Sequence, residues 1–195
     1  MSKMIVLKLE LETNPVLNKR RVIMPARIIE VPQWSVLVTV TVGDVPKEQL
    51  LAELRRLEGD SAVDPDALDT IASGAFDTWE RPAKIRVVLA PLSALGIRSP
   101  IRFRYLPGYA HILGLDLLPP QMVPPFWLKH RHELGHHVAW VAMEPIEQGP
   151  HFEPYIFCLG EHGLEECEAF GNTMFYPQNH FLFKFRKGPG PKKNT

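Results

Sequence analysis

The sequence has little of several features that would assign a protein to a class at once. It contains two cysteines in 195 residues, Cys158 and Cys167, which is too few for a disulfide framework and favours a reducing, intracellular setting. No apolar run approaches the ~18 residues of a membrane-spanning helix. The N-terminus shows neither the apolar core nor the cleavage site of a signal peptide. We therefore expect a cytoplasmic protein without a membrane partner.

The sequence also has no excess of either charge. Lys and Arg total 22, as do Asp and Glu, so no net charge attracts the chain to nucleic acid. The exception is the segment Lys184 to Thr195, which is basic, contains no acid and is predicted to be a disordered tail. A nucleic-acid contact is expected only there, if anywhere. All eight histidines fall at His111 or later, which places the expected chemistry in the C-terminal half.

Hydrophobic periodicity divides the rest of the chain into two predicted regions. Residues 1–82 are expected to form a β-rich and helical scaffold, and residues 83–183 a metal-binding domain. Alternation and β-branched content predict strands, and apolar residues at helical spacing predict helices. The predicted strands cover residues 5–12, 21–31, 35–42 and 84–90, and the predicted helices cover about 45–57 and 64–79.

The segments that lead to the histidines read as a strand pair followed by a helix. Residues 101–105 and 109–118 are predicted to pair across Pro107-Gly108. An edge strand at 109–118 could bind an extended peptide by strand addition. Pro124 and Pro125 suit the first turn of a helix from about Phe126 to Met143.

That predicted helix carries His-Glu-x-x-His at residues 132–136. Positions i and i+4 share a helix face, so His132 and His136 could hold one Zn²⁺ ion. Glu133 would act as the general base on a zinc-bound water. Catalytic zinc usually has a third protein ligand. The two candidates are Glu166, on a second predicted helix at 164–175, and His151, in a loop.

The two segments together resemble the ImmA/IrrE family of zinc metallopeptidases. The resemblance rests on His132-Glu133-Leu134-Gly135-His136 and on the pattern from Glu166 through Glu168, Phe170 and Gly171 to Pro177. It covers about residues 105–177 and implies that Glu166 is the third ligand. It further implies an α+β zincin-like domain, in which a twisted sheet packs on the first helix and the second helix closes the site. The implied function is zinc-dependent hydrolysis of a peptide or protein substrate.

Two alternatives remain open. SprT-like proteases place a third histidine at a comparable distance after the motif, which would make His151 the ligand. The chain could instead be a non-catalytic module in which zinc is structural or the fold only binds a partner. In the peptidase interpretation, four residues are candidates to stabilise the oxyanion: His151, Tyr155, His162 and Tyr176.

Overall fold

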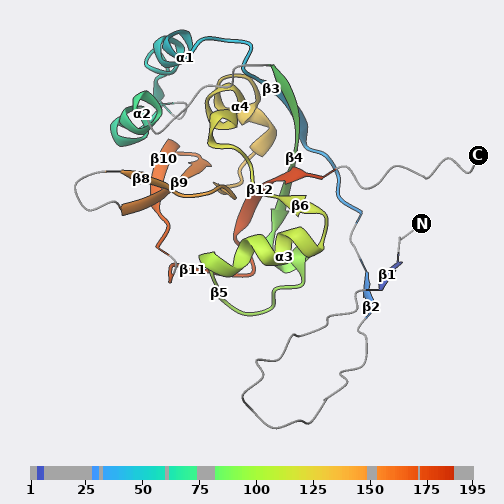
Figure 1. The fold of residues 1–195 in the computed structure, drawn as a ribbon. Helices are drawn as coiled ribbons and strands as arrows, with labels where there is room; N and C mark the ends of the chain where they lie inside the picture. Colours follow the sequence, from blue (N-terminus) through green and yellow to red (C-terminus); the bar gives the residue numbers. More distant parts are fainter. Residues whose placement is uncertain are drawn as a thin grey trace, which may run out of the picture. The chain divides into compact units, whose positions relative to one another are not determined.

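The computed structural model describes residues 4–6, 28–30, 33–59, 62–73, 82–148, 153–170 and 172–186 (Figure 1). The chain divides into two compact units, Met1–Gln33 and Trp34–Thr195. In the first, β1 (Met4–Val6) pairs antiparallel with β2 (Ile28–Glu30). These strands overlap the two predicted at residues 5–12 and 21–31, and the rest of those two ranges lies outside the described residues.

The second unit is built on an eight-stranded sheet. Its central path runs β10-β9-β7-β12-β4-β3, while β6 pairs with β12 and β8 with β9. Among these described strands, only β7 and β12 pair in parallel, and the other pairs are antiparallel. The strands are β3 (Val38–Val42), β4 (Ala83–Pro91), β6 (Leu115–Asp116), β7 (Ala139–Val141), β8 (Ile146–Gln148), β9 (Glu153–Gly160), β10 (Gly163–Glu168) and β12 (His180–Phe185).

Four α-helices and a small strand pair complete the described part of this unit. α4 contacts both β3 and α1, and α2 contacts α1 and β10 (Figure 1). A separate antiparallel pair joins β5 to β11. The bounds are α1 (Lys47–Leu54), α2 (Pro65–Ala72), α3 (Leu106–Ile112), α4 (Val123–His130), β5 (Ile101–Arg102) and β11 (Met174–Phe175).

The α+β class and several predicted elements are confirmed. β3 and β4 lie within or around the strands predicted at 35–42 and 84–90, and α1 lies within the helix predicted at 45–57. α2 begins where predicted: the Asp64 side chain accepts a hydrogen bond of 2.9 Å from the Asp66 N–H, and Pro65 occupies the first turn. Because β3 pairs with β4, the sheet runs across the boundary predicted between residues 82 and 83.

An aromatic cluster fills the core around β12. Phe181 is fully buried and lies 4.9 Å from Phe175 and 5.9 Å from Trp140, measured between ring centroids. Phe175 also contacts Phe103, at 5.8 Å. Each large ring removes apolar surface from water, worth about 25 cal/mol per Å². The cluster therefore fixes β5 and β11 against the main sheet.

The predicted hairpin at 101–105 and 109–118 is wrong. Residues 106–112 form α3, and only Leu115–Asp116 of the second range is a strand. Pro107 occupies the first turn of α3, where its fixed φ and missing N–H suit a helix as well as a turn. The peptide-binding edge strand expected at 109–118 is lost with the hairpin.

The long helix predicted from Phe126 to Met143 is also wrong. α4 ends at His130, the 3-10 helix η5 (Arg131–Leu134) follows, and residues 139–141 form β7. β7 pairs with β12 on one side and with β9 on the other. Buried pairing with two neighbours satisfies the strand's backbone groups and overrides its helical spacing.

The second predicted helix, at residues 164–175, is replaced by strands. β10 folds back on β9 through a turn at Glu161 and His162, and its partner in the first pair is Gly160. The turn ends at Gly163, whose φ is 117° and whose added Cβ would collide with the carbonyl oxygen of Ala62. Glycine is therefore needed there, and it starts a strand.

The predicted tail begins too early, because Lys184 and Phe185 belong to β12. Residues 187–195 lie outside the described part. Within the described ranges, no helix is long and apolar enough to cross a membrane.

Candidate functional site

The His-Glu-x-x-His segment does not lie on one helix. His132 and Glu133 belong to η5, and His136 lies in the turn that follows it. The side chain of His132 is 71% exposed and that of Glu133 is 41% exposed. His132 Nε2 lies 3.5 Å from Glu133 Oε1, which is a contact between chain neighbours in solvent. The regular helix that would align the two imidazoles on one face is interrupted.

Two local features interrupt the helix at the motif. The Arg131 guanidinium donates to the carbonyls of Trp127 and Leu128, at 3.1 and 3.0 Å, and so pairs acceptors that the helix end leaves free. Gly135 then adopts φ 59° and ψ −121°, a conformation that side-chain-bearing residues rarely adopt. The chain leaves the helical direction between His132 and His136.

The predicted third ligands do not complete a metal site among the described residues. Glu166 lies on β10, opposite Phe157 of β9. His151 lies outside the described residues. Across the described ranges no group of three or more His, Cys, Asp or Glu side chains could hold a metal ion. The zinc site that the motif indicates therefore stays a prediction.

The remaining oxyanion candidates come from separate elements. Tyr155 lies on β9 opposite Glu168. His162 lies in the turn between β9 and β10, with Nε2 3.7 Å from Glu161 Oε1. Tyr176 follows β11 and is 51% exposed. Their roles as oxyanion donors stay predictions of the motif.

Two histidines beside the motif have lowered pKa values. Burial lowers the pKa of His130, with help from His132 and Lys129, while Glu133 acts in the opposite direction. Burial and then the neighbouring His137 lower the pKa of His180. The rings of His137 and His180 lie 4.4 Å apart. Both shifts favour neutral imidazole and follow from packing, so they do not by themselves mark a catalytic centre.

A different surface gathers exposed functional side chains. We call it the Arg–Tyr face. It consists of residues from β5, η3 (Phe103–Tyr105), α3 and β11, together with the residue after β11: Arg102, Arg104, Tyr105, Tyr109, Ile112, Met174 and Tyr176. All seven are exposed, with Tyr105 at 54% and Tyr109 at 47%.

Backbone geometry brings these residues together. Arg102 stands directly opposite Met174 in the β5–β11 pair, and opposite residues share a face. Ile101 and Phe175 form the buried pair beside them. Residues 105, 109 and 112 have the i, i+4, i+7 spacing of one helix face. Because β5 continues directly into η3 and α3, the two exposed surfaces adjoin.

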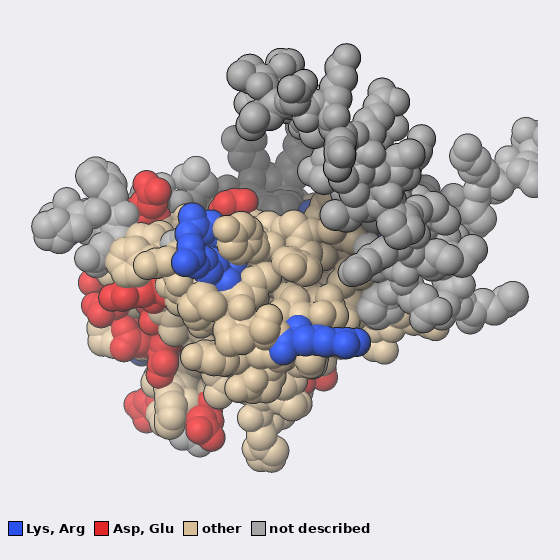
Figure 2. Space-filling view, turned by 90° about the horizontal axis from the view of Figure 1, so that it is seen from below, with Lys and Arg blue, Asp and Glu red and all other residues tan. Residues whose placement is uncertain are grey.

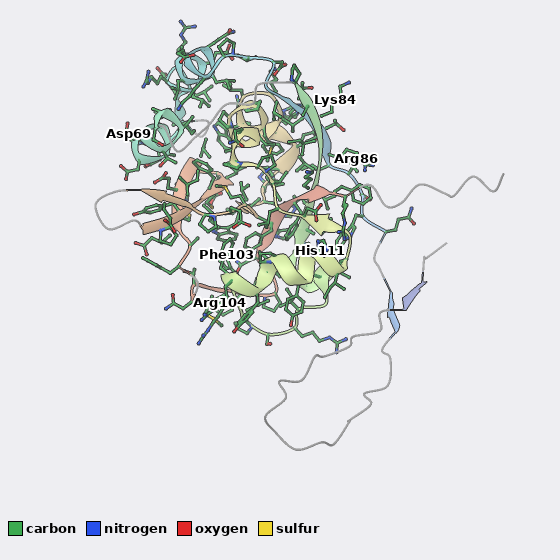
Figure 3. All side chains as sticks on the ribbon, in the orientation of Figure 1. Asp69, Lys84, Arg86, Phe103, Arg104 and His111 are labelled. Atoms are coloured by element: carbon green, nitrogen blue, oxygen red, sulfur yellow. The ribbon has the colours of Figure 1, made fainter. Side chains whose placement is uncertain are left out.

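Exposed and buried side chains alternate from Arg102 to Arg104, where β5 continues into η3. Phe103 is buried against Phe175, while Arg102 and Arg104 on either side of it are exposed. In Figure 3, Arg104 lies at the start of α3, on the outer side of the ribbon. Its guanidinium lies 5.6 Å from the ring centroid of Tyr105, a cation–π contact. The face thus rests on rigid apolar packing.

Arg102 and Arg104 give this face a positive charge that no described acid pairs. The sequence has no Asp or Glu between Arg81 and Leu115, or after Glu168. Neither Arg102 nor Arg104 forms an ion pair with a described residue. Seen from the side of α3, β5 and β11, most of the surface is uncharged, with two groups of Lys or Arg and with most acidic side chains toward the left edge (Figure 2).

Asp116, the first acid after the acid-free run from Arg81 to Leu115, already has partners. Asp116 Oδ1 lies 3.3 Å from His111 Nδ1 and 4.0 Å from an Arg186 guanidinium nitrogen. Arg186 also donates to the carbonyl oxygen of His111, at 2.6 Å. These contacts tie the end of α3 to the residue that follows β12. They leave Arg102 and Arg104 free to meet an external anion.

Sequence reasoning missed the Arg–Tyr face because it treated residues 101–118 as a hairpin. The acid-free run from Arg81 to Leu115, with Arg102, Arg104, Tyr105 and Tyr109 close together in it, was the signal that could have found it. Counting the charged residues segment by segment, and not only over the whole chain, identifies this acid-free run.

The chain matches no family model, no curated protein and no solved structure.

Proposed function

We propose that the chain is a protein-interaction module whose Arg–Tyr face binds a protein segment that carries acidic and apolar side chains. The observation that carries this proposal is the gathering of exposed tyrosines with two arginines that pair with no described acid, on segments whose sequence lacks Asp and Glu. Tyr, Met and Arg are the residues enriched at the centres of protein interfaces, whereas Lys, Glu and Asp are depleted there. The surface has this composition.

The charge of the face specifies the partner. Two exposed guanidinium groups that form no ion pair with a described residue attract carboxylates and bind them in a bidentate geometry. Ile112 and Met174 add exposed apolar surface to the same face. A partner with Asp or Glu beside a hydrophobic side chain complements both features.

Rigid support favours binding by this face. Phe103, Phe175 and Phe181 hold β5 and β11 in place, so little conformational entropy is lost when a partner docks. Nucleic acid is less favoured, because the chain has no net positive charge and polyanion binding depends mainly on many cationic contacts.

A selection from a random peptide library tests the proposal. The immobilised full chain should enrich peptides in which Asp or Glu flanks an aromatic or aliphatic residue. These peptides should bind the Arg102→Glu/Arg104→Glu variant at least about tenfold more weakly, or about 1.4 kcal/mol. The matched control is Arg55→Glu/Arg56→Glu, which makes the same charge change at two exposed residues after α1.

Three results would contradict the proposal. The library could give no enriched sequence, or the enriched peptides could bind both charge-reversed proteins equally. Alternatively, a labelled oligothymidylate could bind the wild type and lose affinity in the Arg102→Glu/Arg104→Glu variant, while no peptide does. That result would assign the face to single-stranded nucleic acid.

Zinc-dependent peptide hydrolysis is the second candidate. Only the spacing of His132, Glu133 and His136 in the sequence favours it. Metal analysis after zinc is supplied tests it, on wild type, His132→Ala, Glu166→Ala and His151→Ala. About one zinc per chain, lost on His132→Ala and Glu166→Ala, would support an ImmA/IrrE-like site. Loss with His151→Ala in place of Glu166→Ala would support an SprT-like site, and loss with all three a closed structural site. A folded wild type without zinc would contradict this candidate.

A further inference from the structure

The chain's two cysteines lie side by side on neighbouring strands. Cys158 is on β9 opposite Glu165, and Cys167 is on β10 opposite Ile156. The two thiols are therefore diagonal neighbours on one face of the β9–β10 hairpin. The turn at residues 161–162, between Gly160 and Gly163, sets this register. Both thiols are free.

The side chains of the two cysteines interact with each other. The Cys158 thiol hydrogen-bonds the Cys167 sulfur, and this bond lowers the pKa of Cys167 and raises that of Cys158. Trp140 of β7, which pairs with Cys158, donates a second hydrogen bond to Cys167. Burial and the carboxylates of Glu165 and Glu166 oppose the shift at Cys167.

Accessibility sets the order in which the two thiols react. Cys158 is buried, whereas Cys167 is only partly buried. The thiolate is the nucleophilic form of cysteine. Cys167 can therefore meet a small oxidant from solvent, while the buried Cys158 lies beside it on the same face of the hairpin. This is the arrangement of an attacking thiol and a resolving thiol.

We propose that Cys158 and Cys167 form a peroxide-sensitive thiol pair that closes to a reversible disulfide. The Cys167 thiolate attacks one oxygen of hydrogen peroxide, so that an S–O bond forms, the O–O bond breaks and hydroxide leaves. The hydroxide takes a proton from solvent to become water. The Cys158 sulfur then attacks the sulfenic sulfur of Cys167, an S–S bond forms, and the S–O bond breaks with loss of a second water. Two thiols and one peroxide thus give one disulfide and two waters.

The position of the pair explains why the disulfide would be reversible. Diagonal neighbours on paired strands lie farther apart than directly opposite residues, and disulfides require close Cα atoms. Closing the disulfide must therefore shift the two strands from their relaxed positions. The resulting strain makes the disulfide easier for a dithiol to reduce. Oxidation would act on the hairpin that carries the predicted ligand Glu166, a consequence independent of the Arg–Tyr face.

The test treats the full chain with hydrogen peroxide and counts free thiols. The wild type should lose both thiols and lose the mass of two hydrogen atoms, and a dithiol should restore them. Proteolysis after Glu161 or Glu165, between the two cysteines, should leave fragments joined until they are reduced. Cys158→Ser should give a dimedone adduct at Cys167, whereas Cys167→Ser should be oxidised at least about tenfold more slowly, because its remaining thiol is buried.

Retention of both thiols at peroxide concentrations that oxidise free cysteine would overturn the proposal. Equal oxidation rates of Cys158→Ser and Cys167→Ser would overturn the assigned order of attack. Disulfides formed only between chains would exclude the intramolecular pair. Circular dichroism of each variant, with Cys158→Ala as a second substitution at the buried site, separates loss of the thiol from loss of the fold.

Discussion

The histidine segment, His130 to His137, and the Arg–Tyr face differ in how the backbone positions their side chains. In the histidine segment a regular spacing in the sequence is broken by a helix end, a 3-10 turn and a glycine with positive φ. In the Arg–Tyr face, residues from two distant segments are brought together by strand pairing and a helix face. A helical motif predicts a site only where one regular element runs through all its residues.

The two regions also differ in what lies beneath them. The Arg–Tyr face rests on Phe103 and Phe175, which belong to the aromatic cluster around Phe181. The exposed side chains of His132 and Glu133 contact each other and solvent. Preorganised surfaces bind more tightly, because less ordering is needed when the partner arrives. This difference is the basis for assigning the binding function to the Arg–Tyr face.

The largest expected effect comes from removing the support of that face. Phe175→Ala should lower the free energy of unfolding by about 3–5 kcal/mol, since the ring is buried against three other aromatic rings. Phe170→Ala, at a residue that is 38% exposed, should cost less than about 1 kcal/mol. Denaturant unfolding measures both. Equal losses would contradict the packing of β11 on the core.

A smaller effect, on the affinity for a selected peptide, should distinguish the Arg–Tyr face from the histidine segment. Tyr109→Ala should weaken binding of a selected acidic peptide by at least about fivefold, or about 1 kcal/mol, with little change in stability because the residue is half exposed. Val138→Ala, at an exposed residue next to the histidine segment, should leave the affinity unchanged. Titration calorimetry with the same peptide checks both variants. A loss confined to Val138→Ala would move the binding site to the histidine segment.

The smallest effect concerns pH. Burial lowers the pKa of His180 below its ordinary value of 6.5, so the folded state binds this proton less readily than the unfolded state does. His180 therefore contributes stability above the unfolded pKa, and that contribution is lost as pH falls from 6.5 through the lowered folded value. His180→Asn should flatten this part of the stability profile, followed by denaturant unfolding between about pH 7 and 5. An unchanged slope would contradict the prediction.

Much of the fold could be predicted from the sequence, because several elements carry signals that tertiary contacts reinforce. The β-branched run of β3 and the Asp64-Pro65 start of α2 are examples. The α+β class followed from them. Residues 101–118 were misread because Pro107-Gly108 suits both a hairpin turn and the first turn of a helix.

The candidate site was harder to predict, for a physical reason. Residues 138–142 are apolar and fit either a helix or a buried strand, and periodicity alone does not separate the two. Pairing of β7 with β9 and β12 decided the outcome, and such pairing depends on distant residues. The Glu-rich run of β10 likewise has helix propensity but pairs with β9. Zinc binding stays a prediction of the motif alone.

One stability measurement tests most directly whether the motif is interrupted, by comparing Gly135→Ala with Gly108→Ala. A Cβ at either position meets no atom within 4 Å, and of these two glycines only Gly135 has a positive φ. Backbone strain should therefore make Gly135→Ala destabilising, by about 1–3 kcal/mol. Gly108→Ala lies within α3 and should be stabilising, by about 0.5–1 kcal/mol. If Gly135→Ala is instead stabilising by about 1 kcal/mol, residues 132–136 lie on a continuous helix, which would contradict the interruption of the motif and favour the zinc-peptidase interpretation of these residues.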